Sequence, residues 1–375
     1  MTNWKVFNES GKKRILVTKM LPGEEWLDIL IDADYRVEVN LSNEFTSKSE
    51  ITERIGTNCK AIIGQLTENW DDELFQIFSK AGGVVYSNYA VGYNNVDVQS
   101  ATKYNIAIGN TPGVLTETTS EMAVALTMAC ARRIVEADSF MRKGRFKGWL
   151  PDLFLGKRLY GSTLGIVGAG RIGSAYALMM VQAFQMNLIY FSNRKNSELE
   201  NTILNYNDFL QKTKNKSITV NRVMTLEDLL READIISIHT PLNKDTHHLI
   251  DKDSFSIMKK DAILINTSRG PIINEKSLVQ HCTHNPTFMA GLDVFENEPF
   301  MSKGMAELEN IVVAPHIASA TKWTREGMAK LAALNIKGVL ENYKLSSSDT
   351  VNVFLENDPP ETIPSIVNSE VLNSK

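Results

Sequence analysis

Short apolar runs alternate along the chain with longer amphipathic stretches. In the first third of the chain, five such runs predict strands, at 14–17, 37–39, 61–63, 84–86 and 106–108. The stretches between them, near 22–33, 49–58, 70–81 and 95–104, have the patterns of helices or turns. Strands that alternate with helices in this way form βαβ units, so this region is predicted to form a parallel sheet covered by helices.

A second series of strands follows one long helical stretch. That stretch runs from Glu117 to Arg142, and Thr116 is placed to cap its first turn. The strands of the second series are predicted at 163–167, 188–191, 235–238, 262–265 and 311–313. The predicted fold class is therefore α/β, with two Rossmann-like or flavodoxin-like doubly wound parallel-sheet domains and an active-site cleft between the domains.

The length of 375 residues also favours two domains, because it exceeds what one core usually holds. A helix predicted at 323–340 returns to the first domain, so one domain comprises residues 1–116 and 317–375. The other comprises 117–316 and includes the linking helix. The tail beyond Ser346 contains several prolines, which cannot continue a helix, and we expect it to run over the surface.

Composition and charge argue against several classes of protein. The formal net charge is −4 and the basic residues are scattered, which disfavours nucleic acid or an anionic membrane as a partner. No apolar run is long enough to span a bilayer, and residues 1–13 lack the apolar stretch of a signal peptide. The three cysteines are far apart, which fits a reducing compartment rather than a disulfide framework. We expect a cytoplasmic protein.

A glycine motif stands at the start of the second series. Residues 168–173 match G-x-G-x-x-G, after a strand that ends at Val167 and before a predicted helix. The glycines allow a tight turn, and backbone N–H groups at the helix N-terminus can then hold a pyrophosphate. The alternative is a glycine-rich turn without a ligand. The dinucleotide contacts predicted here are Gly168, Ala169, Gly170, Arg171, Ile172 and Gly173.

The residues after the next strand indicate which dinucleotide binds. A site that prefers NAD usually has Asp or Glu there, to accept the ribose 2′-hydroxyl. This chain has Ser192, Asn193, Arg194 and Lys195, whose two cations suit the 2′-phosphate of NADP. The pattern therefore favours NADPH. The alternative is a solvated basic turn, with NADH bound through other contacts.

Three polar segments follow strands of the second domain, where open α/β sheets bind ligands. They are 266–270, 291–299 and 315–319. Arg269 in the first segment could hold the carboxylate of a 2-keto acid, and His316 in the third could protonate its carbonyl oxygen. Glu298 in the second could raise the pKa of that histidine and orient it. Taken singly, the three could instead be a sheet-edge cation, a surface charge and a buried core histidine.

With these motifs together, the chain resembles the D-isomer-specific 2-hydroxyacid dehydrogenase family over about residues 14–345. The resemblance implies that Arg269, Glu298 and His316 are the catalytic residues. It also implies that the backbone turn at Val91 and Gly92 binds the substrate's carboxylate. Further cofactor contacts are expected at Thr119, Thr240, Pro241, Thr267, Ser268 and Asp293.

Within the family, the chain is similar to plant-type hydroxypyruvate reductases. The likeness lies in segments 91–97, 110–119, 132–138, 196–221 and 364–368. It implies reduction of hydroxypyruvate to D-glycerate, and of glyoxylate to glycolate, with NAD(P) bound by the 117–316 domain and the substrate by the other domain. The alternatives are a phosphoglycerate dehydrogenase and a non-enzymatic NAD(P)-sensing scaffold.

Trp149 lies in a segment similar to one that lends a tryptophan to the neighbouring subunit's substrate pocket in related reductases. It is therefore a candidate substrate contact, the alternative being an anchor of the subunit interface, and the resemblance implies a homodimer. Two positions depart from the plant enzymes. Ser192 replaces their Asp, and the chain ends in Asn373-Ser374-Lys375 without the leucine of a peroxisomal signal, so peroxisomal import is not expected.

No metal site is predicted. His281 and His284 flank Cys282 with a spacing that metal sites use, but no further ligands are evident near them in the sequence.

Overall fold

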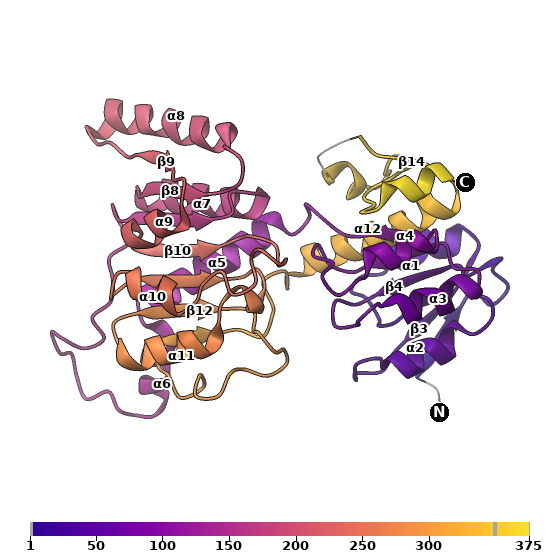
Figure 1. Cartoon of the computed structure of the whole chain (residues 1–375), viewed down its shortest axis with the longest axis horizontal. Coiled ribbons are helices and arrows are strands. Elements are labelled where there is room, and N and C mark those ends of the chain that lie inside the picture. Colours follow the sequence, from indigo (N-terminus) through magenta and orange to yellow (C-terminus); the bar gives the residue numbers. More distant parts are fainter. Residues whose placement is uncertain (1–2, 348–350, 375) are drawn as a thin grey trace. The chain divides into compact units, whose positions relative to one another are not determined.

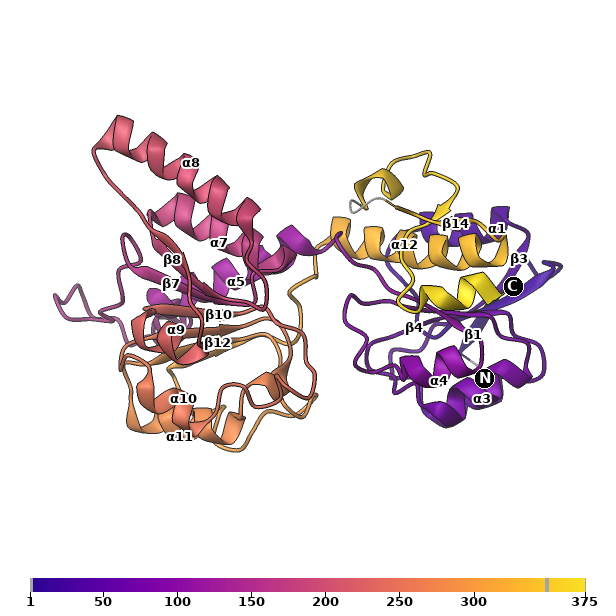
Figure 2. The ribbon, with the colours of Figure 1, turned by 45° about the horizontal axis from the view of Figure 1, so that its top comes forward.

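The computed structural model describes residues 3–347 and 351–374, and the chain divides into two compact units. One unit comprises residues 1–115 and 320–375, and the other comprises residues 116–319 (Figures 1 and 2). Lys375, the last residue of the C-terminal tripeptide, lies outside the described residues. Within the described residues, no helix is long and apolar enough to cross a membrane.

The first unit is built on a six-stranded sheet with the order β1-β3-β2-β4-β5-β6. Its strands are β1 (Trp4–Phe7), β2 (Lys13–Val17), β3 (Tyr35–Asn40), β4 (Ala61–Gly64), β5 (Val85–Asn88) and β6 (Ala107–Gly109). The five predicted strands are confirmed, and they are parallel. The sequence does not predict β1, which pairs antiparallel to β3 at the sheet edge. The reason is that β1 is only four residues long and none of them is fully buried.

Helices cover both faces of this sheet (Figure 2). They are α1 (Glu25–Asp32), α2 (Lys48–Ile55), α3 (Asp72–Lys80), α4 (Val98–Lys103) and α12 (Lys322–Leu340). Helix α12 packs on α1 and on strands β4, β5 and β6. On the other side, Phe75 and Phe78 of α3 pack with Trp70 and Tyr86 in one hydrophobic cluster. This packing buries β5, and the predicted substrate turn follows the carboxyl end of that strand.

The second unit contains a seven-stranded sheet in which every pairing is parallel. Its strands, in spatial order, are β13 (Ile311–Val313), β12 (Met289–Leu292), β11 (Ile263–Asn266), β10 (Ile235–Ile238), β7 (Thr163–Val167), β8 (Asn187–Phe191) and β9 (Val220–Arg222). The order reverses at β7, which lies between β10 and β8. The carboxyl end of β7 is thus the switch point at which sheets of this kind bind ligands. The doubly wound parallel fold is confirmed.

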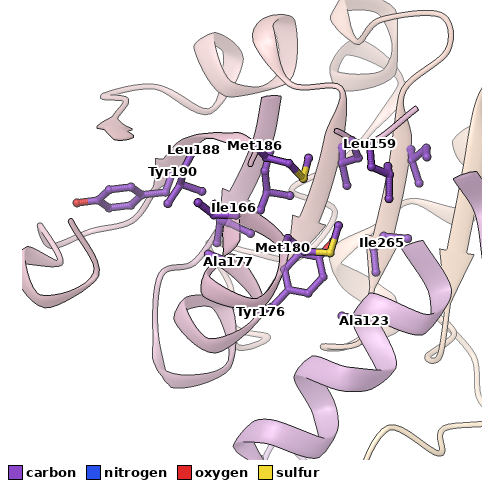
Figure 3. Close-up of a cluster of buried hydrophobic side chains, with 14 of the residues drawn as sticks. Ala123, Leu159, Ile166, Tyr176, Ala177, Met180, Met186, Leu188, Tyr190 and Ile265 are labelled. Carbon is purple, nitrogen blue, oxygen red and sulfur yellow. The ribbon is translucent and has the colours of Figure 1, made fainter. Parts of the chain in front are cut away.

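Seven α-helices belong to the described part of this unit. They are α5 (Thr116–Ala131), α6 (Ile134–Arg142), α7 (Arg171–Phe184), α8 (Ser197–Lys214), α9 (Leu226–Glu232), α10 (Lys252–Ile257) and α11 (Glu275–His284). Figure 3 shows one of the two core clusters of this unit, in which Tyr176 and Met180 of α7 pack near Ile166 of β7. Ala123 of α5 belongs to the same cluster. This packing fixes α7, and with it the glycine loop, against the sheet.

The prediction of one long helix over 117–142 is wrong in one respect, because the segment forms two helices, α5 and α6. Arg133 takes a left-handed backbone conformation with φ 52°, which ends α5 and redirects the chain. The side chain of Arg133 then pairs with Glu136 in the first turn of α6, at 2.8 Å. Neither glycine nor proline marks the break, so the pattern of apolar positions does not reveal it.

The C-terminal tail also differs from the expectation that it runs over the surface. Its apolar side chains Phe354 and Ile363 are fully buried. The Asn368 side chain accepts the N–H of Ile108 and donates to the carbonyl of Ile106, at 2.8 and 2.9 Å. The prolines do exclude a long helix, but the residues between them pack into the first unit.

Candidate active site

The glycine loop has the geometry that a dinucleotide pyrophosphate requires. Gly168 has φ +96°, a conformation that L side chains rarely adopt, and a Cβ on Gly173 would lie 2.1 Å from the Gly168 carbonyl oxygen. At Gly170, by contrast, an added Cβ would meet nothing within 4 Å. Helix α7 begins at the next residue, and no side chain caps it. Its first N–H groups therefore face a space that suits an anion.

The turn after β8 carries the predicted basic residues. Ser192 and Asn193 are fixed through their carbonyl oxygens, which accept from Arg222 Nη2 at 2.9 and 3.1 Å. Lys195 pairs with Glu200 at 3.0 Å. Arg194 is exposed, and among the described residues it forms no ion pair or hydrogen bond. Arg194 is thus available to a ligand. Arg222, which no motif in the sequence indicates, holds the turn in place.

Asn196 connects this turn to the glycine loop. Its Nδ2 donates to the carbonyl of Ala169 and to the Ser174 hydroxyl, both at 3.0 Å. Its Oδ1 accepts the N–H of Leu199 and so caps α8. Because one side chain contacts both segments, the position of the turn after β8 is coupled to that of the glycine loop. The sequence indicates that Asn196 can cap a helix, but it does not indicate the contacts of Asn196 with Ala169 and Ser174.

His316 and Glu298 form a close pair. His316 Nδ1 lies 3.0 Å from Glu298 Oε2, and both side chains are partly exposed. The other carboxylate oxygen of Glu298 accepts the N–H of Phe295 at 3.0 Å. Burial raises the pKa of Glu298, but the hydrogen bond and charge of His316 outweigh it, and the pKa lies below its ordinary value. The carboxylate therefore stays charged and orients the imidazole.

Asp293 holds the backbone on which His316 stands. Asp293 is fully buried, and its two carboxylate oxygens accept the N–H groups of Ile317 and Ala318, each at 2.8 Å. Its own carbonyl oxygen accepts the N–H of His316 at 2.9 Å. His316 itself has φ 55°, a strained conformation for a residue other than glycine. Asp293 thus positions the histidine, whatever contact it makes with a cofactor.

Arg269 belongs to the same site. It follows β11, and its Nη1 donates to the carbonyl of Ser268 at 2.7 Å. Burial lowers the pKa of Arg269, whereas the charge of Glu298 raises it. A Cβ on the next residue, Gly270, would lie 1.8 Å from the carbonyl carbon of Phe295, so the two loops touch there. The structure therefore brings together Arg269, Glu298 and His316.

Four of the remaining candidate cofactor residues, Thr240, Pro241, Thr267 and Ser268, lie just after the carboxyl ends of β10 and β11. The Ser268 hydroxyl donates to the carbonyl of Thr240, and Pro241 accepts a hydrogen bond from the Thr246 hydroxyl at 2.7 Å. The buried hydroxyl of Thr267 has no hydrogen-bond partner among the described residues, as expected for a group that contacts a ligand. Thr119 is buried on α5.

The turn at Val91 and Gly92 lies in the first unit, after β5. Three successive carbonyls of this turn are fixed: Ala90 accepts from Thr111 N–H at 2.9 Å, Val91 from Asn110 Nδ2 at 2.9 Å, and Gly92 from Asn88 Nδ2 at 3.0 Å. In a trans peptide the N–H points away from the carbonyl. Within the described residues, the N–H groups of Val91 and Gly92 donate to no protein acceptor. The turn therefore offers fixed, unused donors to an anion.

Trp149 lies on a loop after α6, with 81% of its surface exposed. Helix α6 has no buried residue. The exposed apolar residues of α6 and this loop are Ile134, Val135, Met141, Phe146, Trp149, Leu150 and Leu155. A surface of this kind typically belongs to an interface.

The residues considered as metal ligands lie elsewhere. The ring of His281 stacks on Phe255, with ring centroids 5.1 Å apart. Among the described residues, no group of three or more His, Cys, Asp or Glu side chains is placed to hold a metal ion.

Comparison with known proteins agrees with this geometry. Residues 124–318 match the family model described as "D-isomer specific 2-hydroxyacid dehydrogenase, NAD binding domain". The chain is 53% identical to a peroxisomal glycerate dehydrogenase of Arabidopsis thaliana, over 98% of this chain and 96% of the relative. It is 40% identical to a glyoxylate reductase of Thermococcus litoralis, over 87% and 93% of the two chains.

Solved structures give the same result. An NADPH-dependent glyoxylate/hydroxypyruvate reductase of Sinorhizobium meliloti, in complex with NADP and malonate, matches with a TM-score of 0.73 and 26% identity, over 89% of this chain and 95% of that one. The chain belongs to the D-isomer-specific 2-hydroxyacid dehydrogenase family. It is thus an oxidoreductase with a nicotinamide dinucleotide as its cofactor, and the glycine loop fits that group.

Proposed function

We propose that this protein reduces hydroxypyruvate to D-glycerate, and glyoxylate to glycolate, with NADPH. The observation that carries the proposal is the pairing of His316 Nδ1 with Glu298 Oε2 at 3.0 Å, beside Arg269 and in the same unit as the glycine loop. Relatives named glycerate dehydrogenase and glyoxylate reductase support the choice of substrates.

In this proposal the chain's own residues bind the keto acid, orient it and move one proton. The bound nicotinamide supplies the hydride. Arg269 and the N–H groups of Val91 and Gly92 hold the substrate's carboxylate, because a guanidinium and fixed backbone donors both recognise that group. Since Glu298 accepts from Nδ1 of His316, the second ring nitrogen, Nε2, is directed to the carbonyl oxygen of the substrate and gives it a proton. A hydride on carbon and a proton on oxygen complete the alcohol.

The preference for NADPH is supported by the turn after β8. Arg194 is an exposed cation of that turn that forms no ion pair among the described residues, and its planar guanidinium suits the 2′-phosphate. Arg222 positions the turn through the carbonyls of Ser192 and Asn193. The solved reductase of Sinorhizobium meliloti binds NADP and is named NADPH-dependent, which agrees with this assignment.

We further propose a homodimer formed through α6 and the loop that carries Trp149. The support is the exposed apolar surface described above, since α6 buries no side chain within its own unit. Trp149 is then either a contact to the neighbouring subunit's substrate or an anchor of the interface.

Steady-state kinetics test the proposed function. Hydroxypyruvate and glyoxylate are each reduced with NADPH and with NADH, and the product from hydroxypyruvate is assayed for chirality. We expect turnover of both acids, D-glycerate as the product, and a higher kcat/KM with NADPH. Oxidation of phosphoglycerate without turnover of either keto acid would contradict the assignment, and so would binding of the dinucleotide without any turnover.

A further inference from the structure

A connected set of buried polar side chains lies behind the substrate turn, entirely within the first unit. Glu68, in the loop after β4, is 6% exposed and accepts a hydrogen bond from Trp70 Nε1 at 3.1 Å. Tyr86 and Asn88, both on β5, are fully buried, and the Tyr86 hydroxyl donates to Asn88 Oδ1 at 3.2 Å. Ordinary packing of a sheet against helices does not require such a set, because each buried polar group costs free energy unless it is hydrogen-bonded.

Two asparagine amides connect this set to the turn. Asn88 and Asn95 bond to each other reciprocally, at 3.2 and 3.3 Å. Asn88 Nδ2 also donates to the carbonyl of Gly92 at 3.0 Å, and Asn95 Nδ2 donates to the backbone carbonyl of Glu68 at 3.0 Å. The loop of Glu68 is therefore linked through Asn95 and Asn88 to the third fixed carbonyl of the substrate turn. A displacement of the Glu68 backbone can therefore be transmitted to Gly92 through three consecutive hydrogen bonds: Glu68 to Asn95, Asn95 to Asn88, and Asn88 to Gly92.

Among the described residues, Glu68 forms no ion pair with a lysine or arginine. Burial raises the pKa of Glu68 to about 7, against the opposing effect of its hydrogen bonds with Thr18 and Trp70. The titratable group that faces it is Tyr86, from β5, whose pKa is also raised by burial and by the charge of Glu68. Thr18, the residue after β2, and Gln65, from its own loop, are its other polar neighbours. Ionisation of Glu68 would therefore place an uncompensated negative charge behind the turn.

The side chains of Glu68 and Tyr86 pack closely against the backbone of Gly64. A Cβ on Gly64 would lie 2.4 Å from the Tyr86 hydroxyl oxygen and 2.7 Å from Glu68 Oε2. The acid and the phenol therefore occupy the space beside a glycine that no larger residue could replace without moving one of them.

We propose that Glu68, Asn95 and Asn88 are positioning residues for the substrate's carboxylate, and that the turn binds a keto acid tightly only while Glu68 is protonated. The inference rests on the proposed role of Val91 and Gly92. Asn88 and Asn95 fix the curvature of the turn. The neutral form of Glu68 keeps a repelling charge away from an anionic substrate, because a buried charge is poorly screened.

The first test compares pH profiles. KM and kcat for hydroxypyruvate are measured between about pH 6 and about pH 9 in the wild-type protein and in Glu68→Gln, which is neutral throughout and keeps an acceptor for Trp70. In the wild type, KM should rise roughly tenfold above about pH 7, as a poorly screened negative charge forms in the unit that carries the turn. In Glu68→Gln that rise should be absent.

The second test removes the amide donors. Asn88→Asp and Asn95→Asp preserve size but lose Nδ2, and each should raise KM for hydroxypyruvate roughly tenfold, with kcat and the Kd for NADPH near the wild-type values. The matched control is Asn368→Asp. Asn368 is buried like Asn88, lies in the same unit and bonds to backbone groups of Ile106 and Ile108, away from the turn. It should lower the unfolding midpoint without changing KM.

The outcomes separate this inference from the proposed function. If the wild-type protein reduces neither keto acid with either dinucleotide, both are overturned. If the wild type is active but Glu68→Gln retains the same rise in KM above about pH 7, the inference alone fails. The comparison with Glu68→Gln stands even if Asn88→Asp does not fold.

Discussion

The Nδ1 atom of His316 lies 3.0 Å from Oε2 of Glu298, although the two residues stand on separate loops. Asp293 holds the loop of His316 through two backbone N–H groups, and the N–H of Phe295 holds the carboxylate of Glu298. Both members of the pair are thus held by the segment after β12, which carries Asp293, Phe295 and Glu298. An imidazole fixed in this way can present its second nitrogen to a substrate without first searching for a rotamer, which favours proton transfer.

The first prediction concerns the proton donor. His316→Ala should lower kcat/KM for hydroxypyruvate by roughly a thousandfold, the middle of the range for general acid catalysis, because the variant lacks the proposed proton donor. NADPH should still bind, as followed by quenching of its fluorescence. His284→Ala, which changes an exposed histidine on α11, is the control and should retain full activity. Substantial turnover by His316→Ala would refute the assigned role.

The second prediction concerns the pH dependence of stability. Burial raises the pKa of Glu298, but the bond and charge of His316 bring it below its ordinary value. A carboxyl whose pKa is lower in the folded than in the unfolded state stabilises the fold above its unfolded pKa, and this is lost as pH falls through the folded pKa. Because the pair is partly exposed, the contribution should be on the order of 1 kcal/mol or less.

The variant Glu298→Gln tests whether the charged carboxylate stabilises the fold. The urea midpoint of the variant should be lower than that of the wild type near neutral pH, and the difference should shrink on acidification below about pH 4. Glu307→Gln, a carboxyl with no ion pair among the described residues, is the matched control and should show no such trend. A difference that grows on acidification would mean that the pair does not stabilise the charged carboxylate.

The fold could be predicted where strands are buried on both faces, because such strands are continuous apolar runs. All residues of β10 are buried, for example, and its apolar run stands out in the sequence. Strand β1 escapes this reasoning because it lies at an edge, partly exposed. The break at Arg133 escapes it because a left-handed arginine has no signature in the pattern of apolar positions. Phe354 and Ile363 are misjudged because their burial depends on packing between distant segments.

The candidate site shows the same division. Arg269, Glu298 and His316 can be identified because each follows a strand within a recognisable motif. Arg222 acts through contacts 29 and 30 residues away in the chain, and Glu68 and Asn88 act from buried positions, so spacing alone does not indicate them. Arg222, for instance, reaches the carbonyl of Ser192, 30 residues earlier. Residues of this second kind are recognised only from the three-dimensional structure.

The third prediction concerns the choice of dinucleotide. Arg194→Ser should raise KM for NADPH roughly tenfold or more, the loss expected for one charge-assisted hydrogen bond, and leave KM for NADH nearly unchanged. Lys212→Ser removes an exposed cation near the end of α8 and controls for the general loss of charge. Equal effects of Arg194→Ser on both dinucleotides would contradict a contact with the 2′-phosphate.

The fourth prediction concerns the subunit interface. Val135 is 53% exposed on α6, a helix that buries no side chain in its own unit. Val135→Asp should convert a dimer into monomers, measured by light scattering, because a charge buried in an apolar interface lacks a partner. Leu204→Asp, at a similarly exposed position on α8, should leave the dimer intact. A wild-type protein that is monomeric at micromolar concentration would refute the interface outright.

Trp149→Ala then decides between the two roles of the exposed tryptophan. If Trp149 reaches the neighbouring subunit's substrate, the variant should remain dimeric and raise KM for hydroxypyruvate without changing KM for NADPH. If Trp149 is only an anchor, dissociation should increase and the KM of the remaining dimer should be unchanged. Because 81% of its surface is exposed within one subunit, the substitution leaves the folding of that subunit nearly unaffected, so either result can be attributed to the partner.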